Sequence, residues 1–204
     1  MEALEAIRQT RIVPVVTFHK PESILPTFGA MLSGKLPVAE ITFRTEFAAE
    51  AIKLGAMTFP DMAVGAGTVT RASQAEAAIE CGAKFIVSPG YSEQVHDICI
   101  GADIPYIPGC VTPTEIMNVL DHGIELIKFF PSEQYGGLKT IKALSAAFPQ
   151  VTFMPTGGIN ESNLIEYLSN PRVIACGGSF MMSGSYDDIA AKCANAVVLV
   201  NSLK

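Results

Sequence analysis

Short apolar runs recur along the chain, and the stretches between them follow a helical period. The runs have the length of strands, are rich in β-branched residues, and are bounded by Gly, Pro, Ser or Asn. Between the runs, apolar residues three and four positions apart predict helices, most clearly over 72–81, 113–121 and 138–147. We predict strands over residues 12–17, 38–42, 63–68, 85–88, 104–108, 126–130, 151–156 and 173–177.

Strand and helix alternate eight times, and no linker or shift in composition interrupts them. The strand starts lie roughly 18 to 26 residues apart, which leaves room for one helix and two short loops. This pattern predicts one α/β domain over residues 1–204, folded as a single (β/α)8 TIM barrel. The alternative is an open doubly wound sheet. We prefer the barrel, because the nearest match to a dinucleotide fingerprint, Gly65-Ala66-Gly67-Thr68-Val69-Thr70, lacks the third glycine and an acidic partner.

Composition and charge narrow the choice of partners. The 204 residues are 49% hydrophobic and only 17% charged, which predicts buried helices and a subunit interface. The formal net charge is −6 and no basic stripe occurs, so nucleic acid is not an expected partner. An anionic substrate remains compatible with this charge, because local cations and backbone N–H groups decide its binding.

Cysteine usage and the N-terminus indicate the compartment. The five cysteines are odd in number and show no C-x-x-C spacing, which predicts free thiols in a reducing cytoplasm. The N-terminal Met1-Glu2-Ala3-Leu4-Glu5 is acidic, whereas a signal peptide begins with basic residues. No apolar stretch reaches the roughly 18 residues that span a bilayer. We therefore expect a soluble cytoplasmic protein without a membrane partner.

A lysine interrupts one of the predicted strands. Lys128 lies in the apolar run Leu126-Ile127-Lys128-Phe129-Phe130-Pro131, and strand alternation places it on the same face as Phe130. Dry surroundings disfavour the charged form of a lysine, and a neutral amine can form a Schiff base with a carbonyl substrate. The alternative is a lysine that reaches solvent or pairs with a carboxylate. The run alone leaves both interpretations open.

The second predicted strand carries a carboxylate and leads to an arginine. Alternation places Glu40, Thr42 and Arg44 on one face. A carboxylate inside a barrel costs free energy unless it has a partner or a task, and Glu40 is a candidate general acid–base. Arg44 is a candidate for bidentate binding of a substrate carboxylate. The alternative, that Glu40 and Arg44 simply pair with each other, is equally compatible with the pattern.

Three predicted strands end in glycine-rich segments: Gly65-Ala66-Gly67-Thr68, Pro155-Thr156-Gly157-Gly158 and Cys176-Gly177-Gly178-Ser179. In barrels, active groups lie at the C-terminal ends of the strands, and the loops after strands seven and eight often hold a phosphate. Exposed backbone N–H groups bind an anion there without lysine or arginine. The first segment alone is better interpreted as a tight turn. The two Gly-Gly pairs at successive strand ends, each beside a hydroxyl, predict a phosphate site.

The remaining candidates carry weaker signals. The three histidines show no metal-ligand spacing, so we expect no metal and no other cofactor. His19 follows the first predicted strand near the mouth of the barrel, where a surface histidine is the simpler interpretation. We expect Pro89 to line the pocket. Cys110 and Cys176 have no base nearby in the sequence and are interpreted as small packing residues.

Taken in order, six motifs make the chain similar to the class I 2-keto-3-deoxy-6-phosphogluconate (KDPG) aldolase family, which includes 4-hydroxy-2-oxoglutarate (KHG) aldolases. The motifs are Glu40-x-Thr42-x-Arg44-Thr45-Glu46, Gly65-Ala66-Gly67-Thr68, Ser88-Pro89-Gly90, Lys128-Phe129-Phe130-Pro131, Pro155-Thr156-Gly157-Gly158 and Gly177-Gly178-Ser179. The resemblance runs through nearly the whole chain.

This resemblance implies a metal-free Schiff-base aldolase, assembled as a homotrimer of barrels. The implied reaction is the reversible cleavage of KDPG to pyruvate and glyceraldehyde 3-phosphate. By the same resemblance Lys128 is the Schiff-base lysine and Glu40 the proton shuttle. The implied substrate-binding residues are Arg44 and Thr68 for the pyruvyl carboxylate, Pro89, Phe130 and Thr156 along the pocket, and Gly157, Gly158, Gly178 and Ser179 around the phosphate.

The first predicted strand departs from this family pattern, since it lacks an arginine that many relatives place near its end. Contacts at that rim are left open. Three alternatives also remain: a phosphogalactonate aldolase, a phosphate-binding barrel isomerase or epimerase in which Lys128 is only an electrostatic group, and a non-catalytic sugar-phosphate-binding barrel. The segments 44–46 and 155–156 favour the phosphogluconate branch.

Overall fold

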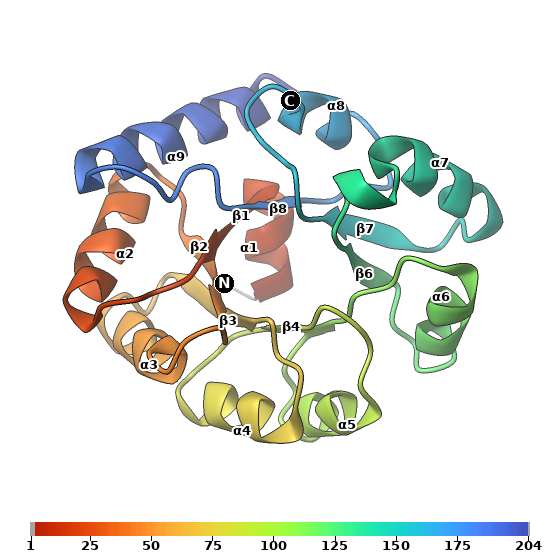
Figure 1. Cartoon of the computed structure of the whole chain (residues 1–204), viewed down its shortest axis with the longest axis horizontal. Helices are drawn as coiled ribbons and strands as arrows, with labels where there is room; N and C mark the ends of the chain where they lie inside the picture. Colours follow the sequence, from red (N-terminus) through yellow and green to blue (C-terminus); the bar gives the residue numbers. More distant parts are fainter. Residues whose placement is uncertain (1–2, 204) are drawn as a thin grey trace.

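Strands and helices alternate along the chain, with the strands inside and most of the helices around them (Figure 1). The structure is a computed structural model that describes residues 3–203; Met1 and Glu2, which begin the acidic N-terminal stretch, and Lys204 lie outside the described residues. The strands are β1 (Ile12–Val16), β2 (Val38–Thr42), β3 (Ala63–Gly67), β4 (Ile86–Val87), β5 (Tyr106–Ile107), β6 (Leu126–Phe129), β7 (Thr152–Pro155) and β8 (Cys176–Gly178).

The helices follow the strands in the predicted order. They are α1 (Ala3–Thr10), α2 (Ile24–Ser33), α3 (Ala48–Thr58), α4 (Ala72–Glu80), α5 (Glu93–Gly101), α6 (Pro113–Leu120), α7 (Gly137–Ala147), α8 (Leu164–Leu168) and α9 (Tyr186–Asn201), with short 3₁₀ turns η1 (Pro21–Ser23) and η2 (Glu133–Tyr135). Helix α1 ends one residue before β1, so it lies at the N-terminal side of the strands (Figure 1). No helix in the described range is long and apolar enough to cross a membrane.

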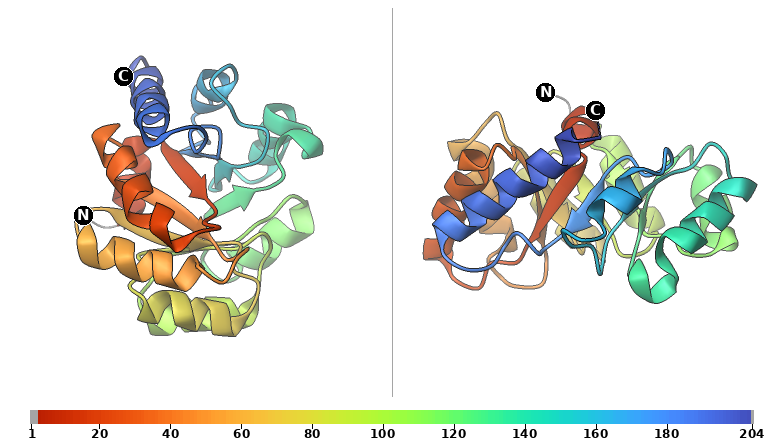
Figure 2. Two further views of the ribbon diagram at one scale, coloured as in Figure 1. Left: turned by 60° about the vertical axis from the view of Figure 1, so that its left-hand side comes forward. Right: turned by 90° about the horizontal axis from the view of Figure 1, so that it is seen from above.

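Every strand pairing in the described residues is parallel. Six strands form a sheet in the order β5-β4-β3-β2-β1-β8, and β6 pairs with β7 in a second sheet. Single backbone bridges join the two sheets: Gly109 with Lys128, Phe153 with Val173, and Thr156 with Gly177. The chain therefore has an α/β fold built on a curled parallel sheet. The last helix, α9, packs beside α2, as Figures 1 and 2 show.

Several strands are shorter than the apolar runs predicted. The predicted strands at 85–88 and 104–108 are only two residues long in the structure. Strand β5 is short because Pro105 and Pro108 flank it, and proline has no N–H to donate to a neighbouring strand. The run at 173–177 begins with a turn, in which Val173 N–H donates to Asn170 O, and regular pairing with β1 starts only at Cys176. Because of this turn, β8 covers Cys176–Gly178 and starts three residues later than the predicted strand.

The core is apolar on both faces of the strands, as a parallel sheet covered by helices requires. All five residues of β2 and of β3 are buried. The register places Glu40 directly between Val15 of β1 and Gly65 of β3. The burial of Glu40 and Lys128 in this otherwise apolar region sets them apart, because charged side chains are almost never fully buried unless they are paired.

Candidate active site

Lys128 and Glu40 form a buried ion pair. The Nζ atom of Lys128 lies 2.9 Å from Oε1 of Glu40, and the two residues are 4% and 0% exposed. Lys128 comes from β6 in the two-stranded sheet and Glu40 from β2 in the six-stranded sheet, so the pair joins the two sheets. Glu40 therefore pairs with Lys128, and the alternative in which its partner is Arg44 is wrong.

The surroundings of Glu40 hold its carboxylate in place. Gly67 of β3 has no side chain, and a Cβ at that position would collide with the Glu40 carboxylate. Among residues 3–203, no group donates a hydrogen bond to the second carboxylate oxygen, Oε2, although this atom is buried. A buried acceptor without a partner is unusual in a protein interior. This oxygen is therefore available to a substrate hydroxyl or to a water molecule.

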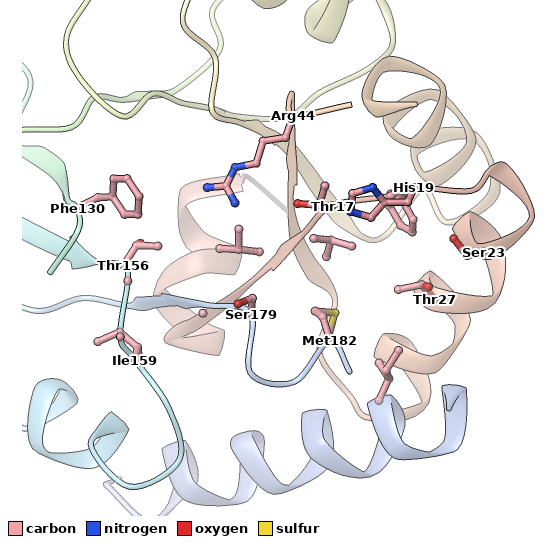
Figure 3. Close-up of a pocket in the computed structure, with 17 residues that line it drawn as sticks. Thr17, His19, Ser23, Thr27, Arg44, Phe130, Thr156, Ile159, Ser179 and Met182 are labelled. Carbon is pink, nitrogen blue, oxygen red and sulfur yellow. The ribbon is translucent and has the colours of Figure 1, made fainter. Parts of the chain in front are cut away.

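A cavity of about 530 Å³ lies at the C-terminal ends of the strands (Figure 3). Seven predicted substrate-binding residues line it: Arg44, Phe130, Thr156, Gly157, Gly158, Gly178 and Ser179. The ion pair adjoins this cavity through Phe130, whose ring centroid lies 5.3 Å from Lys128 Nζ. Two predicted residues are outside the lining: Thr68, which follows β3 with φ of 56°, and the exposed Pro89 after β4.

The loop after β7 presents its backbone to the cavity. Gly157 and Gly158 have φ values of 94° and 83°, a conformation that other residues rarely adopt. The carbonyl of Thr156 accepts a hydrogen bond from Ser132 N–H at 2.8 Å, and the carbonyl of Gly157 accepts one from Glu133 N–H at 3.2 Å. These bonds fix the peptide planes of the loop. Consecutive peptides in such turns form concave surfaces that bind anions.

Hydrogen bonds also connect the ends of β1 and β2. The hydroxyls of Thr17 and Thr42 lie 2.6 Å apart, and the Thr42 hydroxyl also donates to Val16 O at 3.2 Å. One residue beyond Arg44, the Thr45 hydroxyl donates to Phe18 O at 2.7 Å. These contacts hold the turn that carries Arg44 against the segment after β1. Figure 3 shows the Arg44 guanidinium pointing into the cavity.

The sequence interpretation missed part of this lining. His19 was interpreted as a surface residue; it is exposed, but it also lines the cavity, on the side away from Phe130 (Figure 3). Arg44 and His19 are the only ionisable side chains among the 17 lining residues. Thr17, Ser23 and Thr27 contribute hydroxyls on the same side. Thr17, His19 and Ser23 lie between β1 and α2, where no periodic pattern sets the side-chain direction, whereas Thr27 lies within α2.

The cysteines near the strand ends behave as packing residues. Cys110 and Cys176 are buried. Burial raises the pKa of the Cys110 thiol to about 12 and also raises the pKa of Cys176, so both thiols stay protonated at neutral pH. Within residues 3–203, no three His, Cys, Asp or Glu side chains come together as a metal site.

Comparisons with known proteins agree with this geometry. The family model "KDPG and KHG aldolase" matches residues 4–194. A 2-dehydro-3-deoxy-phosphogluconate aldolase of Treponema pallidum is 44% identical over 178 residues, covering 87% of this chain and 85% of that protein. A KHG/KDPG aldolase of Escherichia coli K12 is 39% identical over 192 residues, covering 91% of this chain and 90% of that protein.

A solved structure is similar over almost the whole fold. The KDPG aldolase of Legionella pneumophila, crystallised with pyruvate captured as a covalent carbinolamine, superposes with a TM-score of 0.92 and 35% sequence identity. The alignment covers 96% of this chain and 98% of that one. The family resemblance carried by the six sequence motifs is confirmed: this chain belongs to the KDPG and KHG aldolase family.

Proposed function

We propose that this chain is a Schiff-base aldolase that reversibly cleaves KDPG to pyruvate and glyceraldehyde 3-phosphate. By the same chemistry it cleaves KHG to pyruvate and glyoxylate. The observation that carries the proposal is the buried Lys128–Glu40 pair beside a cavity with one strong cation and a glycine-rich rim. Two relatives that are 44% and 39% identical to this chain are named as aldolases of these substrates, which supports the same activity.

The pair supplies both groups that the chemistry needs. A proton that moves from Lys128 Nζ to Glu40 Oε1, across 2.9 Å, leaves a neutral amine and a carboxylic acid. The amine attacks the C2 carbonyl of the substrate, and the acid returns the proton to the carbonyl oxygen, giving a carbinolamine. Loss of water from the carbinolamine gives an iminium ion.

The iminium then withdraws the electrons of the breaking bond. Glu40, or a water molecule bound to it, removes the proton of the C4 hydroxyl; the C3–C4 bond breaks, and its electron pair forms an enamine on the lysine. The C4 fragment leaves as an aldehyde. Protonation of the enamine at C3 and hydrolysis of the iminium release pyruvate and restore the free lysine. The unpartnered Oε2 of Glu40 supports this proton-transfer role.

The other residues bind and orient the substrate in this proposal. Arg44 and Thr68 hold the carboxylate, while Pro89, Phe130 and Thr156 form the walls. The backbone of Gly157, Gly158 and Gly178, together with Ser179, binds the phosphate. Binding the phosphate far from the reacting bond aligns the substrate, so its interactions lower the barrier as well as the KM.

His19 is a further candidate for binding the substrate. The glycine loops offer dipoles but no charge, and Arg44 is assigned to the carboxylate at the opposite end of the substrate. His19 is the one further ionisable side chain in the cavity lining. It occupies the rim where many relatives have an arginine near the end of the first strand. We assign the His19 side chain, as a hydrogen-bond donor, to the phosphate group.

We further propose that residues 1–204 form one closed (β/α)8 barrel domain. The bridges from Gly109 to Lys128 and from Thr156 to Gly177, at the two seams between the sheets, support closure. Five unpaired cysteines support a reducing cytoplasm as its location.

Reductive trapping tests the covalent step. Borohydride added with pyruvate should attach one reduced pyruvate to Lys128, because it reduces the iminium to a stable amine. Intact-mass measurement and peptide mapping locate the adduct. K128Q should give no adduct, and wild-type protein that remains unmodified would contradict the mechanism.

Glu40→Gln tests the proton shuttle. We expect turnover to fall roughly a hundred- to ten-thousand-fold, the range for loss of a general acid–base. Pyruvate binding should change little, because the amide keeps the shape of the side chain. E50Q, which alters an exposed carboxylate on α3, is the matched control. Equal turnover in E40Q and E50Q would remove Glu40 from this role.

His19→Asn tests the assignment of His19 to the phosphate. We expect the KM for KDPG to rise about tenfold, since a hydrogen bond to a charged group contributes roughly 1.5 kcal/mol or more. The KM for KHG, which has no phosphate, should change much less. K20N removes the neighbouring exposed cation, which is outside the cavity lining. The same rise for both substrates, or for K20N, would refute the assignment.

The molar mass tests the assembly. We propose a homotrimer, supported by exposed apolar side chains such as Met57, Met117 and Val198, which are 60–71% exposed in the single chain. Light scattering of the purified protein should give three times the mass of one chain. A monomer at micromolar concentration would exclude the trimer.

A further inference from the structure

Helices α5 and α6 are neighbours in the ring of helices (Figure 1), and four rings from α5, from β5 and from the segments before α5 and after α6 cluster together. We call Tyr91, His96, Tyr106 and His122 the ring cluster. The closest pair is His96 and His122, whose centroids lie 5.1 Å apart, followed by Tyr91 and His122 at 5.2 Å. None of the four residues lines the catalytic cavity. A separate cavity of about 840 Å³ opens beside them and is lined by His96, Tyr106 and His122.

The ring cluster leaves buried polar atoms without partners. His96 is only 9% exposed, and neither of its ring nitrogens has a hydrogen-bond partner among residues 3–203. The buried hydroxyl of Tyr91 has none there either. Of the five such buried side-chain atoms in the described chain, three belong to this cluster and one to Glu40. Unpaired buried polar atoms cost free energy, so this concentration of them calls for an explanation.

His122 has the second-sphere contact typical of a metal ligand, whereas His96 has only a longer approach to a carboxylate. His122 Nδ1 lies 2.9 Å from the carbonyl of Asn118; an N–H at Nδ1 donates to it and leaves the lone pair on Nε2. His96 Nδ1 lies 3.5 Å from a carboxylate oxygen of Asp97. Metal-binding histidines commonly direct one ring N–H at a backbone carbonyl or carboxylate and ligate the metal through the other nitrogen.

We propose that His96 and His122 bind one divalent ion of the zinc class through their Nε2 atoms. With Zn–N bonds of about 2.0–2.1 Å at a tetrahedral ion, two imidazole centroids lie roughly 5 Å apart, as they do here. Water molecules from the adjoining cavity complete the coordination. The Tyr91 hydroxyl donates to one of these waters.

The cavity also contains a thiol, but imidazole is the better ligand here. Cys99 lines the same cavity, and burial raises its pKa to about 12, which keeps it protonated. Metals bind the thiolate, not the thiol. Neutral imidazole is the ligand that zinc, copper and nickel share. An ion at this site would connect α5 to the segment that leads into β6, the strand of Lys128.

Calorimetric titration with ZnCl₂ tests the site on full-length protein stripped with EDTA. We expect one ion per chain with micromolar affinity. H122Q and H96N should each weaken binding at least tenfold, because each removes one arm of the chelate. His122 is exposed, so H122Q keeps the test valid if H96N fails to fold. H19N, which changes the third histidine, and C99S are matched controls and should bind zinc as wild type does.

Histidine side-chain NMR gives a second readout. Long-range ¹H–¹⁵N spectra should show Nε2 of both residues shifting on addition of Zn²⁺ while Nδ1 stays protonated. No binding by wild type would overturn the proposal and leave water as the partner of these atoms. Binding lost in C99S or H19N but kept in H122Q would overturn it as well. Neither readout depends on aldolase activity.

Discussion

The contact between Lys128 and Glu40 is the constraint on which the rest of the molecule depends. Removing one member of a buried ion pair typically costs about 3–5 kcal/mol, because the other charge is left uncompensated. An intact buried pair nevertheless adds little net stability, since both ions lose their hydration. At a separation of 2.9 Å the two groups can exchange a proton without a change of fold, which is what the proposed mechanism requires.

The cavity beside the pair divides recognition between charge and backbone. Arg44 is the strong cation of the lining, while Gly157 and Gly158 expose peptide groups in a conformation that few other residues tolerate. An acidic chain can therefore bind a strongly anionic substrate without a basic surface. The net charge of −6 is no obstacle, because the groups near the bound anion decide its binding rather than the total charge of the chain.

Much of this arrangement could be predicted from local patterns, and the exceptions have physical causes. Apolar runs located all eight strands, and a charged residue within such a run identified Lys128 and Glu40 as candidates. The partner of Glu40 could not be predicted, because strand alternation puts Arg44 on the same face, whereas Lys128 lies 88 residues away. Only the packing of one sheet against the other decides between them.

Most of the features that the sequence did not predict involve residues in loops. His19 and Ser23 follow β1, where no periodicity constrains the side-chain direction, so nothing local indicated that they face the cavity. The ring cluster is similar, since His96 and His122 are 26 positions apart and come together only because α5 and the segment after α6 are neighbours. Strand β8 also starts later than predicted, because the chain turns at Val173 and the apolar residues of this segment gave no sign of the turn.

The division of the strands into two sheets has a mechanical consequence. The amine belongs to β6 and the carboxylate to β2, and few backbone bridges cross the seams between their sheets. If the two sheets moved apart slightly at either seam, Lys128 Nζ and Glu40 Oε1 would separate beyond hydrogen-bond distance while the helices stayed folded. The proposed chemistry therefore requires both sheets in their assembled positions, and intact helices alone would not supply it.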